Sequence, residues 1–169
     1  MREFVNQKAK LLQPSGIRKF FDIVQSEKGA ISLGVGEPDF VTAWRVRAAA
    51  ITALQKGRTQ YTGNRGLPEL LELICRYLSE RFSLDYSPKN TIVTVGGSEA
   101  IDLALRACVE QGDVILIPDP AYVSYSPLVL MSDGTPVAVE CREKDNFALT
   151  PELLEKAITP KTKGIILAY

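Results

Sequence analysis

The chain of 169 residues contains no histidine, few cysteines and no excess of either charge. Without histidine it cannot form a Ser–His or Cys–His nucleophile pair or offer imidazole ligands to zinc, and we predict no metal site. Lysine plus arginine and aspartate plus glutamate each number 20, so the formal net charge is zero. Because the sequence shows no basic stripe and no apolar run of membrane-spanning length, we expect neither a nucleic-acid nor a membrane partner.

The three cysteines, Cys75, Cys108 and Cys141, are odd in number and far apart, and each lies in an apolar or helical context. This pattern favours buried free thiols in a reducing compartment. No apolar segment follows the basic residues near the first residue, so the sequence shows no signal peptide. We therefore expect a cytoplasmic protein.

Composition and periodicity indicate a globular α/β protein. Hydrophobic residues make up 46% of the chain and charged residues 24%, and the length allows one ordinary core but not two full domains. Thr42 and Thr150 are the expected N-caps of the first and last predicted helices. Strands are predicted over residues 91–95, 114–117, 136–140 and 164–168, and helices over 43–56, 69–82, 98–110, 122–132 and 151–158. Strands that alternate with helices predict a parallel sheet with helices on its faces.

A predicted strand, a two-glycine turn and a predicted helix follow one another over residues 91–105. Free N–H groups in the first turn of a helix, together with the helix dipole, form an anion site. Gly96 and Gly97 allow the backbone to approach a phosphate, and Ser98 supplies either a hydroxyl donor or an N-cap. The residues point either to a binding site for a phosphorylated small molecule or to an ordinary strand–turn–helix joint.

Residues 164–168 form a continuous apolar run, which is typical of a strand buried on both faces of a parallel sheet. In open α/β sheets the ligands lie just beyond the carboxyl ends of the strands. Tyr169 follows this run directly, at the point where such a ligand-binding loop would begin. We therefore expect the chain to be the first part of a longer protein.

Four segments occur in an order and spacing that resemble one family: residues 31–40 (ISLGVGEPDF), 61–70 (YTGNRGLPEL), 95–101 (VGGSEAI) and 118–125 (PDPAYVSY). The family is the class I and II pyridoxal-phosphate-dependent aminotransferases of fold type I, which are similar to aspartate aminotransferase. The resemblance implies a three-layer fold, a parallel-type sheet with flanking helices, truncated before the large domain is complete. It implies an N-terminal arm and the start of the small domain over residues 1–45, and the first part of the large cofactor-binding domain over 46–169.

The resemblance implies that the cofactor is pyridoxal 5′-phosphate and that the backbone around Gly97, Ser98 and Glu99 binds its phosphate. Tyr122 matches the aromatic ring that the family places against the pyridine face. Offset stacking of that kind contributes about 0.5–1.5 kcal/mol beyond the burial of area. Without the resemblance, Tyr122 would be interpreted as a core tyrosine beside two prolines.

Two further matches concern a partner subunit and the substrate. Tyr61 matches a tyrosine that reaches across the interface of a homodimer to the neighbouring subunit's cofactor phosphate; the alternative is a plain surface or turn residue. Gly36 matches the glycine whose backbone N–H meets the substrate α-carboxylate; the alternative is a tight turn. Arg18 is expected near the substrate entrance.

No catalytic residue is predicted within these 169 residues. The family's Schiff-base lysine, its aspartate for the pyridinium nitrogen and its substrate-binding arginine would all follow Tyr169. Lys161 and Lys163 do not replace that lysine, because they lie at the start of strand 164–168 and so at the opposite end of the sheet from the ligand site. We expect the parent protein to move an amino group from an amino acid to a 2-oxo acid, and this chain alone to be inactive.

Other functions stay open on the sequence. One is another fold-type I pyridoxal-phosphate enzyme, such as a C–S lyase or a synthase, which uses nearly the same front half. A second is a non-catalytic gene fragment or phosphate-binding module. A doubly wound nucleotide-binding domain is disfavoured, because the sequence has neither a Gly-x-Gly-x-x-Gly turn after a strand nor a Gly-Lys-Ser/Thr phosphate loop.

Overall fold

The computed structural model describes residues 4–12, 36 and 38–168. The chain divides into two compact units. One, here called the sheet unit, comprises Met1–Ser15 and Val95–Tyr169, and the other, the helical unit, comprises Gly16–Thr94.

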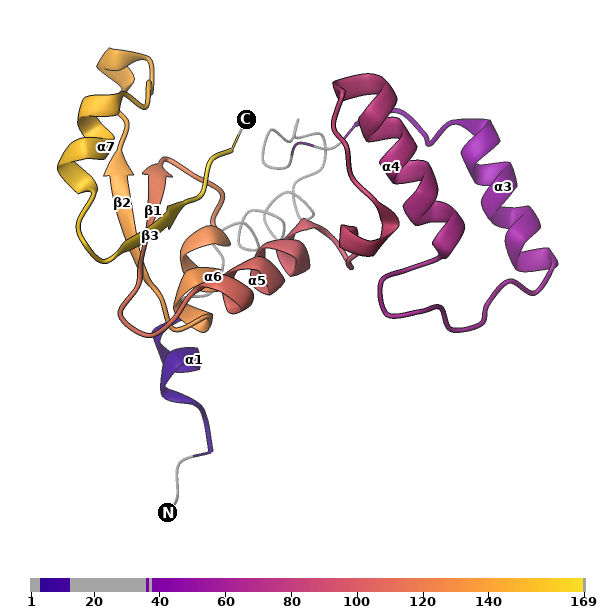
Figure 1. Ribbon diagram of the computed structural model, residues 1–169, viewed down its shortest axis with the longest axis horizontal. Coiled ribbons are helices and arrows are strands. Elements are labelled where there is room, and N and C mark those ends of the chain that lie inside the picture. Colours follow the sequence, from indigo (N-terminus) through magenta and orange to yellow (C-terminus); the bar gives the residue numbers. More distant parts are fainter. Residues whose placement is uncertain (1–3, 13–35, 37, 169) are drawn as a thin grey trace, which may run out of the picture. The chain divides into compact units, whose positions relative to one another are not determined.

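The sheet unit is built on three parallel strands, β1 (Val114–Asp119), β2 (Thr135–Glu140) and β3 (Thr162–Ile165), in the order β2-β1-β3 (Figure 1). In the register, Leu116 of β1 lies opposite Val137 on one side and Ile165 on the other. Leu116 is fully buried, as expected for the middle of a central strand. The predicted α/β architecture with a parallel sheet is confirmed.

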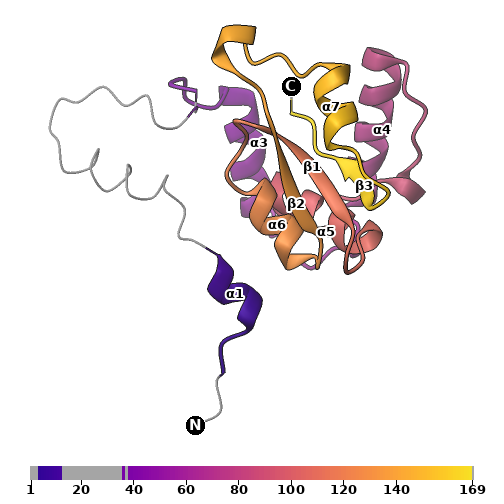
Figure 2. The ribbon, with the colours of Figure 1, turned by 90° about the vertical axis from the view of Figure 1, so that its left-hand side faces the viewer.

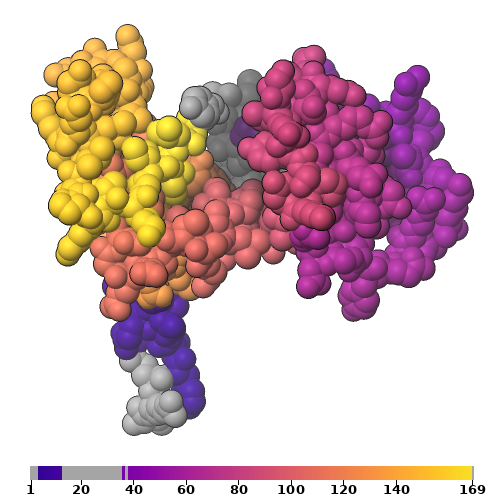
Figure 3. Space-filling view, in the orientation of Figure 1, coloured from indigo at the N-terminus to yellow at the C-terminus, as the bar shows by residue number. Residues whose placement is uncertain are grey.

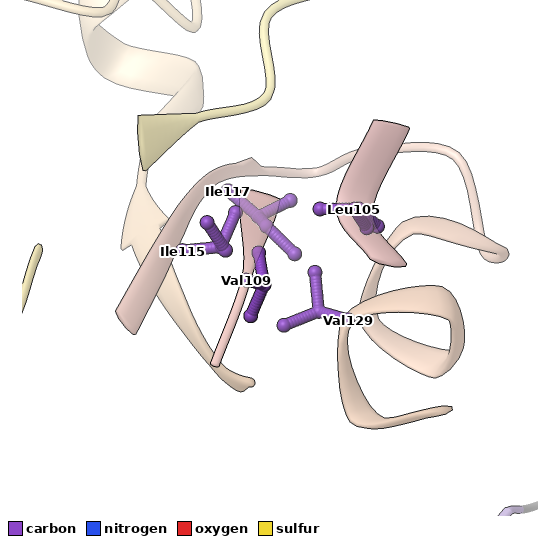
Figure 4. Packing of buried hydrophobic residues seen from close by; sticks show 5 residues of the cluster. All are labelled: Leu105, Val109, Ile115, Ile117 and Val129. Atoms are coloured by element: carbon purple, nitrogen blue, oxygen red, sulfur yellow. The ribbon is translucent and has the colours of Figure 1, made fainter. Parts of the chain in front are cut away.

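Two helices cover one face of this sheet, α5 (Gly97–Cys108) and α6 (Tyr125–Met131). Figure 4 shows the side chains that meet between them and β1, which are Leu105, Val109, Ile115, Ile117 and Val129. Apolar positions that recur at helical spacing on α5 and at every second residue on β1 bring these side chains together. The core of the unit therefore joins the helix that carries the glycine turn to the central strand.

The other face of the sheet carries α7 (Pro151–Ala157), which contacts β2 (Figure 1). Thr150 caps α7 as predicted, because its hydroxyl oxygen accepts a hydrogen bond from the Leu153 N–H and Pro151 fills the first helical position. A short 3-10 helix, η2 (Glu143–Asp145), joins β2 to this region. The flanking helices thus lie on both faces of the sheet, as the sequence predicted.

The helical unit contains α3 (Trp44–Gln55), α4 (Pro68–Phe82) and the 3-10 helix η1 (Pro88–Asn90). On α4 the buried side chains are Leu71 and Cys75, and the Cys75 sulfur lies 3.4 Å from the Thr91 hydroxyl oxygen. On α3 no described side chain is buried.

Two predicted helix features need correction. Thr42 is not the N-cap of α3, which begins one residue later with Ala43 as its N-cap and no capping side chain. Cys108, the last residue of α5, is exposed, whereas Cys75 and Cys141 are buried as predicted. Gly57, with φ +66°, follows the C-cap Lys56 and ends α3 where the sequence expected.

Two strand predictions also differ from the structure. Residues 91–95 join no ladder among the described residues, although Thr91 is extended and the Val93 N–H donates to the Arg65 carbonyl at 2.9 Å. The strand predicted over 164–168 is instead Thr162–Ile165, and it is not buried on both faces. Since β3 is an edge strand among the described strands, Ile165 and Leu167 keep 37% and 50% of their surface exposed. The C-terminal segment that contains β3 is yellow in Figure 3.

Candidate active site: the phosphate cradle at α5

The glycine turn before α5 has a backbone conformation that requires glycine at one position. Gly96 is the N-cap of α5, with φ +84° and ψ 166°, a region that residues with a Cβ atom rarely enter. Gly97 is the first helical residue. Among the described residues, no atom lies within 4 Å of the place where a Cβ of either glycine would stand. The start of α5 therefore has open space in front of it.

Glu99 shapes the electrostatics of this helix end. It is the third helical residue, and its carboxylate accepts a hydrogen bond from the Val95 backbone N–H, as in a capping box displaced by one residue. Because Gly96 brings no capping side chain, the first-turn N–H groups of α5 have neither an intrahelical acceptor nor a side-chain cap on that residue. Together with the dipole of a 12-residue helix, they can bind an anion.

Ser98 is the second helical residue of α5 and is exposed, so it is not the N-cap that the sequence left open. Hydrogen bonds from Ser124, and then from Ser98, hold the pKa of the Tyr122 phenol below its ordinary value, since they stabilise the phenolate. The structure thus brings Ser98 and Tyr122 together from residues that are far apart in the chain.

Tyr122 lies in the loop between β1 and α6, just after the cis Asp119–Pro120 bond. Its side chain is 51% exposed, so it is not the core tyrosine that the sequence alone would suggest. The ring meets the Tyr125 ring edge-on, with centroids 5.5 Å apart and an interplanar angle of 77°. Tyr125 thereby supports one side of the Tyr122 ring and leaves the rest of it accessible.

The donor set fits the phosphate end of pyridoxal phosphate. An open helix start, a glycine conformation without side chains in front of it, and a serine hydroxyl next to an accessible aromatic ring are what a phosphorylated aromatic molecule requires. Sequence reasoning missed Ser124 as the first donor to Tyr122. The available sequence signal was that Ser124 follows Tyr122 by two residues in the segment Tyr122-Val123-Ser124.

The remaining predicted site residues lie in the helical unit. Tyr61 is fully exposed in the loop between α3 and α4. Gly36 is exposed, with no atom within 4 Å of the place of a Cβ. Arg18 lies outside the described residues. The roles of Tyr61 and Gly36 stay predictions.

The two lysines considered from the sequence lie at the other end of the sheet. Lys163 belongs to β3, and its ammonium nitrogen is 3.8 Å from the carboxylate of Asp113, which immediately precedes β1. Tyr122 follows the opposite end of β1. A strand of six residues, about 20 Å long, separates the two positions. This geometry supports the exclusion of Lys161 and Lys163 as reacting groups.

Among the described residues, no helix has both the length and the apolar character needed to cross a membrane.

Comparison with known proteins identifies the family. Residues 28–169 match the family described as aminotransferase class I and II. The chain is 50% identical over 168 residues to YugH of Bacillus subtilis (strain 168), provisionally named an aminotransferase, and the match covers 99% of this chain and 44% of that protein.

Two further matches agree. The aspartate aminotransferase of Pyrococcus abyssi (strain GE5 / Orsay) is 43% identical over 158 residues, which are 93% of this chain and 41% of that protein. The structure of aspartate aminotransferase from Thermus thermophilus with maleate has a TM-score of 0.90 at 33% identity, over 99% of this chain and 44% of that chain. The chain thus spans less than half the length of these relatives and has the α/β fold of the fold type I aminotransferases. It belongs to the aminotransferase class I and II family.

Proposed function

We propose that the chain is the N-terminal part of a pyridoxal-phosphate-dependent aminotransferase that moves an amino group from an amino acid to a 2-oxo acid. The observation that carries the proposal is the open start of α5, with Gly96 in a glycine-only conformation, Ser98 on the first turn and Tyr122 about half exposed in the loop before α6. The family and the names of the relatives support the reaction class.

Within this proposal, the residues of the sheet unit bind and orient. The first-turn N–H groups of Gly97, Ser98 and Glu99 donate to the cofactor phosphate, and the Ser98 hydroxyl adds a donor. Tyr122 stacks on the pyridine ring and fixes its plane. Pyridoxal phosphate, when bound, supplies an electron sink for the bonds at the substrate α-carbon.

The proposal extends to residues whose roles rest on the resemblance. The Tyr61 hydroxyl would donate to the cofactor phosphate of the neighbouring subunit in a homodimer, and the Gly36 N–H would donate to the substrate α-carboxylate. We also place the whole protein in the cytoplasm. The domain division at residues 45 and 46 stays a prediction.

Lys163 lies at the far end of the strands from Tyr122, so it cannot carry a proton at a cofactor bound beside that ring. Binding and chemistry are therefore separable in this chain. We expect it to bind the cofactor through phosphate contacts and stacking, and to leave the proton transfer to residues that it does not contain.

The experiment compares pyridoxal 5′-phosphate with pyridoxal, which lacks the phosphate, in a binding titration with the 169-residue chain. We expect the phosphorylated form to bind more tightly and to be displaced by inorganic phosphate. Tyr122→Phe, which keeps the ring, is expected to bind more tightly than Tyr122→Ala. Equal affinity for the two compounds, with no competition by phosphate, would show that no phosphate cradle exists.

A further inference from the structure

Asp133 occupies an electrostatically unfavourable position at the end of α6. The N–H of Asp133 donates to the Leu130 carbonyl at 3.2 Å, and the N–H of Gly134 donates to the Val129 carbonyl at 3.0 Å. These are the two bonds of a Schellman motif, in which Asp133 takes the left-handed position with φ +67°. Glycine is the usual residue there, and a carboxylate also faces the negative end of the helix dipole.

The ion-pair partner of Asp133 comes from the N-terminal segment. The Lys8 ammonium nitrogen lies 2.5 Å from an Asp133 carboxylate oxygen. Lys8 belongs to α1 (Gln7–Leu11), which Asn6 caps by accepting the Lys8 N–H at 2.8 Å. Helix α1 packs against α6 within the sheet unit (Figures 1 and 2).

Leu12, the residue that follows α1, lies near the phosphate cradle, which is the first turn of α5 at Gly97, Ser98 and Glu99. Leu12 lines a hollow of about 330 Å³ together with Ser98 of α5 and Ser124, the N-cap of α6. The rest of the lining comes from the same loop and helix, namely Val123, Pro127, Leu128 and Met131. Leu12 therefore adds an apolar side chain to the wall of the hollow that Ser98 and Ser124 also line.

We infer that the segment Asn6–Leu12 is an intramolecular strap, held by the Lys8–Asp133 ion pair, which covers the hollow beside Ser98. The ion pair sets where the strap docks, and Leu12 buries the apolar wall of the hollow. The carboxylate at the negative end of α6 is then offset by its cationic neighbours, Lys8 in the ion pair and Arg106, whose pKa Asp133 helps to raise. The strap depends on the packing of the sheet unit and does not require a bound cofactor.

The pair is partly exposed, with 36% of the Lys8 side chain and 52% of the Asp133 side chain accessible. Its contribution should therefore be that of a surface ion pair, which shifts the docked–undocked equilibrium by about 1.4- to fivefold and weakens in salt. A mutation that removes the pair should therefore shift the docked–undocked equilibrium within this range.

The test measures the rate at which chymotrypsin cleaves the chain after Leu11, followed by mass spectrometry, in the absence of phosphate. When opening is fast relative to cleavage, this rate reports the population of the undocked strap. We expect Lys8→Met and Asp133→Asn each to raise the rate by about 1.4- to fivefold, and the double variant to raise it no further than either one. High salt should raise the rate in the unmodified chain and have less effect in the variants.

Asp133→Asn also distinguishes a role of Asp133 in holding the strap from a role in stabilising the sheet unit. Asparagine tolerates the left-handed conformation and removes the charge that opposes the helix dipole, so the stability of the sheet unit should not fall while cleavage rises. The matched control is Arg142→Met, which removes the exposed Arg142–Glu140 pair at 3.1 Å and should leave cleavage after Leu11 unchanged. An unchanged rate in Lys8→Met and Asp133→Asn, or an additive double variant, would overturn the inference. None of these outcomes depends on cofactor binding, so they are independent of the proposed function.

Discussion

Alanine in place of Gly96 and alanine in place of Gly97 should have different effects on the free energy of unfolding. Gly96 has φ +84° and ψ 166°, and no atom crowds the place of its Cβ. The cost of Gly96→Ala is therefore one of backbone strain alone, about 1–3 kcal/mol. Gly97 is helical and equally uncrowded, so Gly97→Ala should leave the free energy of unfolding unchanged or raise it by up to about 1 kcal/mol.

Gly97→Ala should weaken phosphate binding, although it should not lower the free energy of unfolding. A methyl group there occupies the open space in front of the helix, where a phosphate oxygen would approach the first-turn N–H groups. Loss of one charge-assisted hydrogen bond costs about 1.5–3 kcal/mol, so we expect phosphate affinity to fall about tenfold or more. A variant that is as stable as the parent and binds phosphate more weakly separates binding from folding.

Two measurements decide the matter. Hydrogen exchange at the amides of β1 follows the stability of the sheet unit, because these amides lie in its central strand. A titration with inorganic phosphate gives the affinity. The reasoning is refuted if Gly96→Ala is as stable as the parent chain, or if Gly97→Ala binds phosphate with the parent's affinity.

Three further predictions follow from the sheet unit. Gly134→Ala should lower the free energy of unfolding by about 1–3 kcal/mol, because its Cβ would stand 2.8 Å from a Val109 methyl and 3.0 Å from a Val129 methyl. Urea unfolding of Gly134→Ala and of Gly134→Ala/Val109→Ala gives this free energy, and a double variant that recovers none of the lost stability would count against the clash. Ser98→Ala should raise the pKa of Tyr122 toward the ordinary value of about 10, as measured by tyrosinate absorbance against Tyr122→Phe. Since folding lowers this pKa, the associated stabilisation is complete above the unfolded-state pKa and is lost as the pH falls through the folded-state value; an unchanged titration curve would contradict the hydrogen bond. The 169-residue chain should not accelerate exchange between pyridoxal phosphate and an amino acid, and borohydride should label its lysines diffusely; stoichiometric labelling of one lysine, with turnover lost on its change to alanine, would show that the chemistry lies within the chain.

The sequence predicted those parts of the fold that depend on local patterns. Thr150 and Pro151 signal the start of α7 through capping and a fixed φ, which act within one turn. The parallel pairing of β1 with β2 follows from strands that alternate with helices. Gly96 and Gly97 could be recognised because a strained turn leaves few residue types to choose from.

Features that depend on distant neighbours could not be predicted in the same way. The apolar run 164–168 has the composition of a buried strand, but among the described strands β3 pairs only with β1, and so Ile165 and Leu167 stay partly exposed. Residues 91–95 have high β-propensity, yet a strand needs a partner to form a ladder. The Lys8–Asp133 pair joins residues that are far apart in the sequence, and neither residue carries a local signal of the other.

The most direct test of the phosphate cradle is a nuclear magnetic resonance titration of the isotopically labelled chain with pyridoxal 5′-phosphate and, separately, with inorganic phosphate. We predict that both ligands shift the backbone amide signals of Gly97, Ser98 and Glu99, that pyridoxal phosphate alone also shifts the ring signals of Tyr122, and that the amides of α7 stay unchanged. Amide shifts that avoid the first turn of α5, or that are equally large throughout the chain, would contradict the assignment of this helix end as the phosphate site.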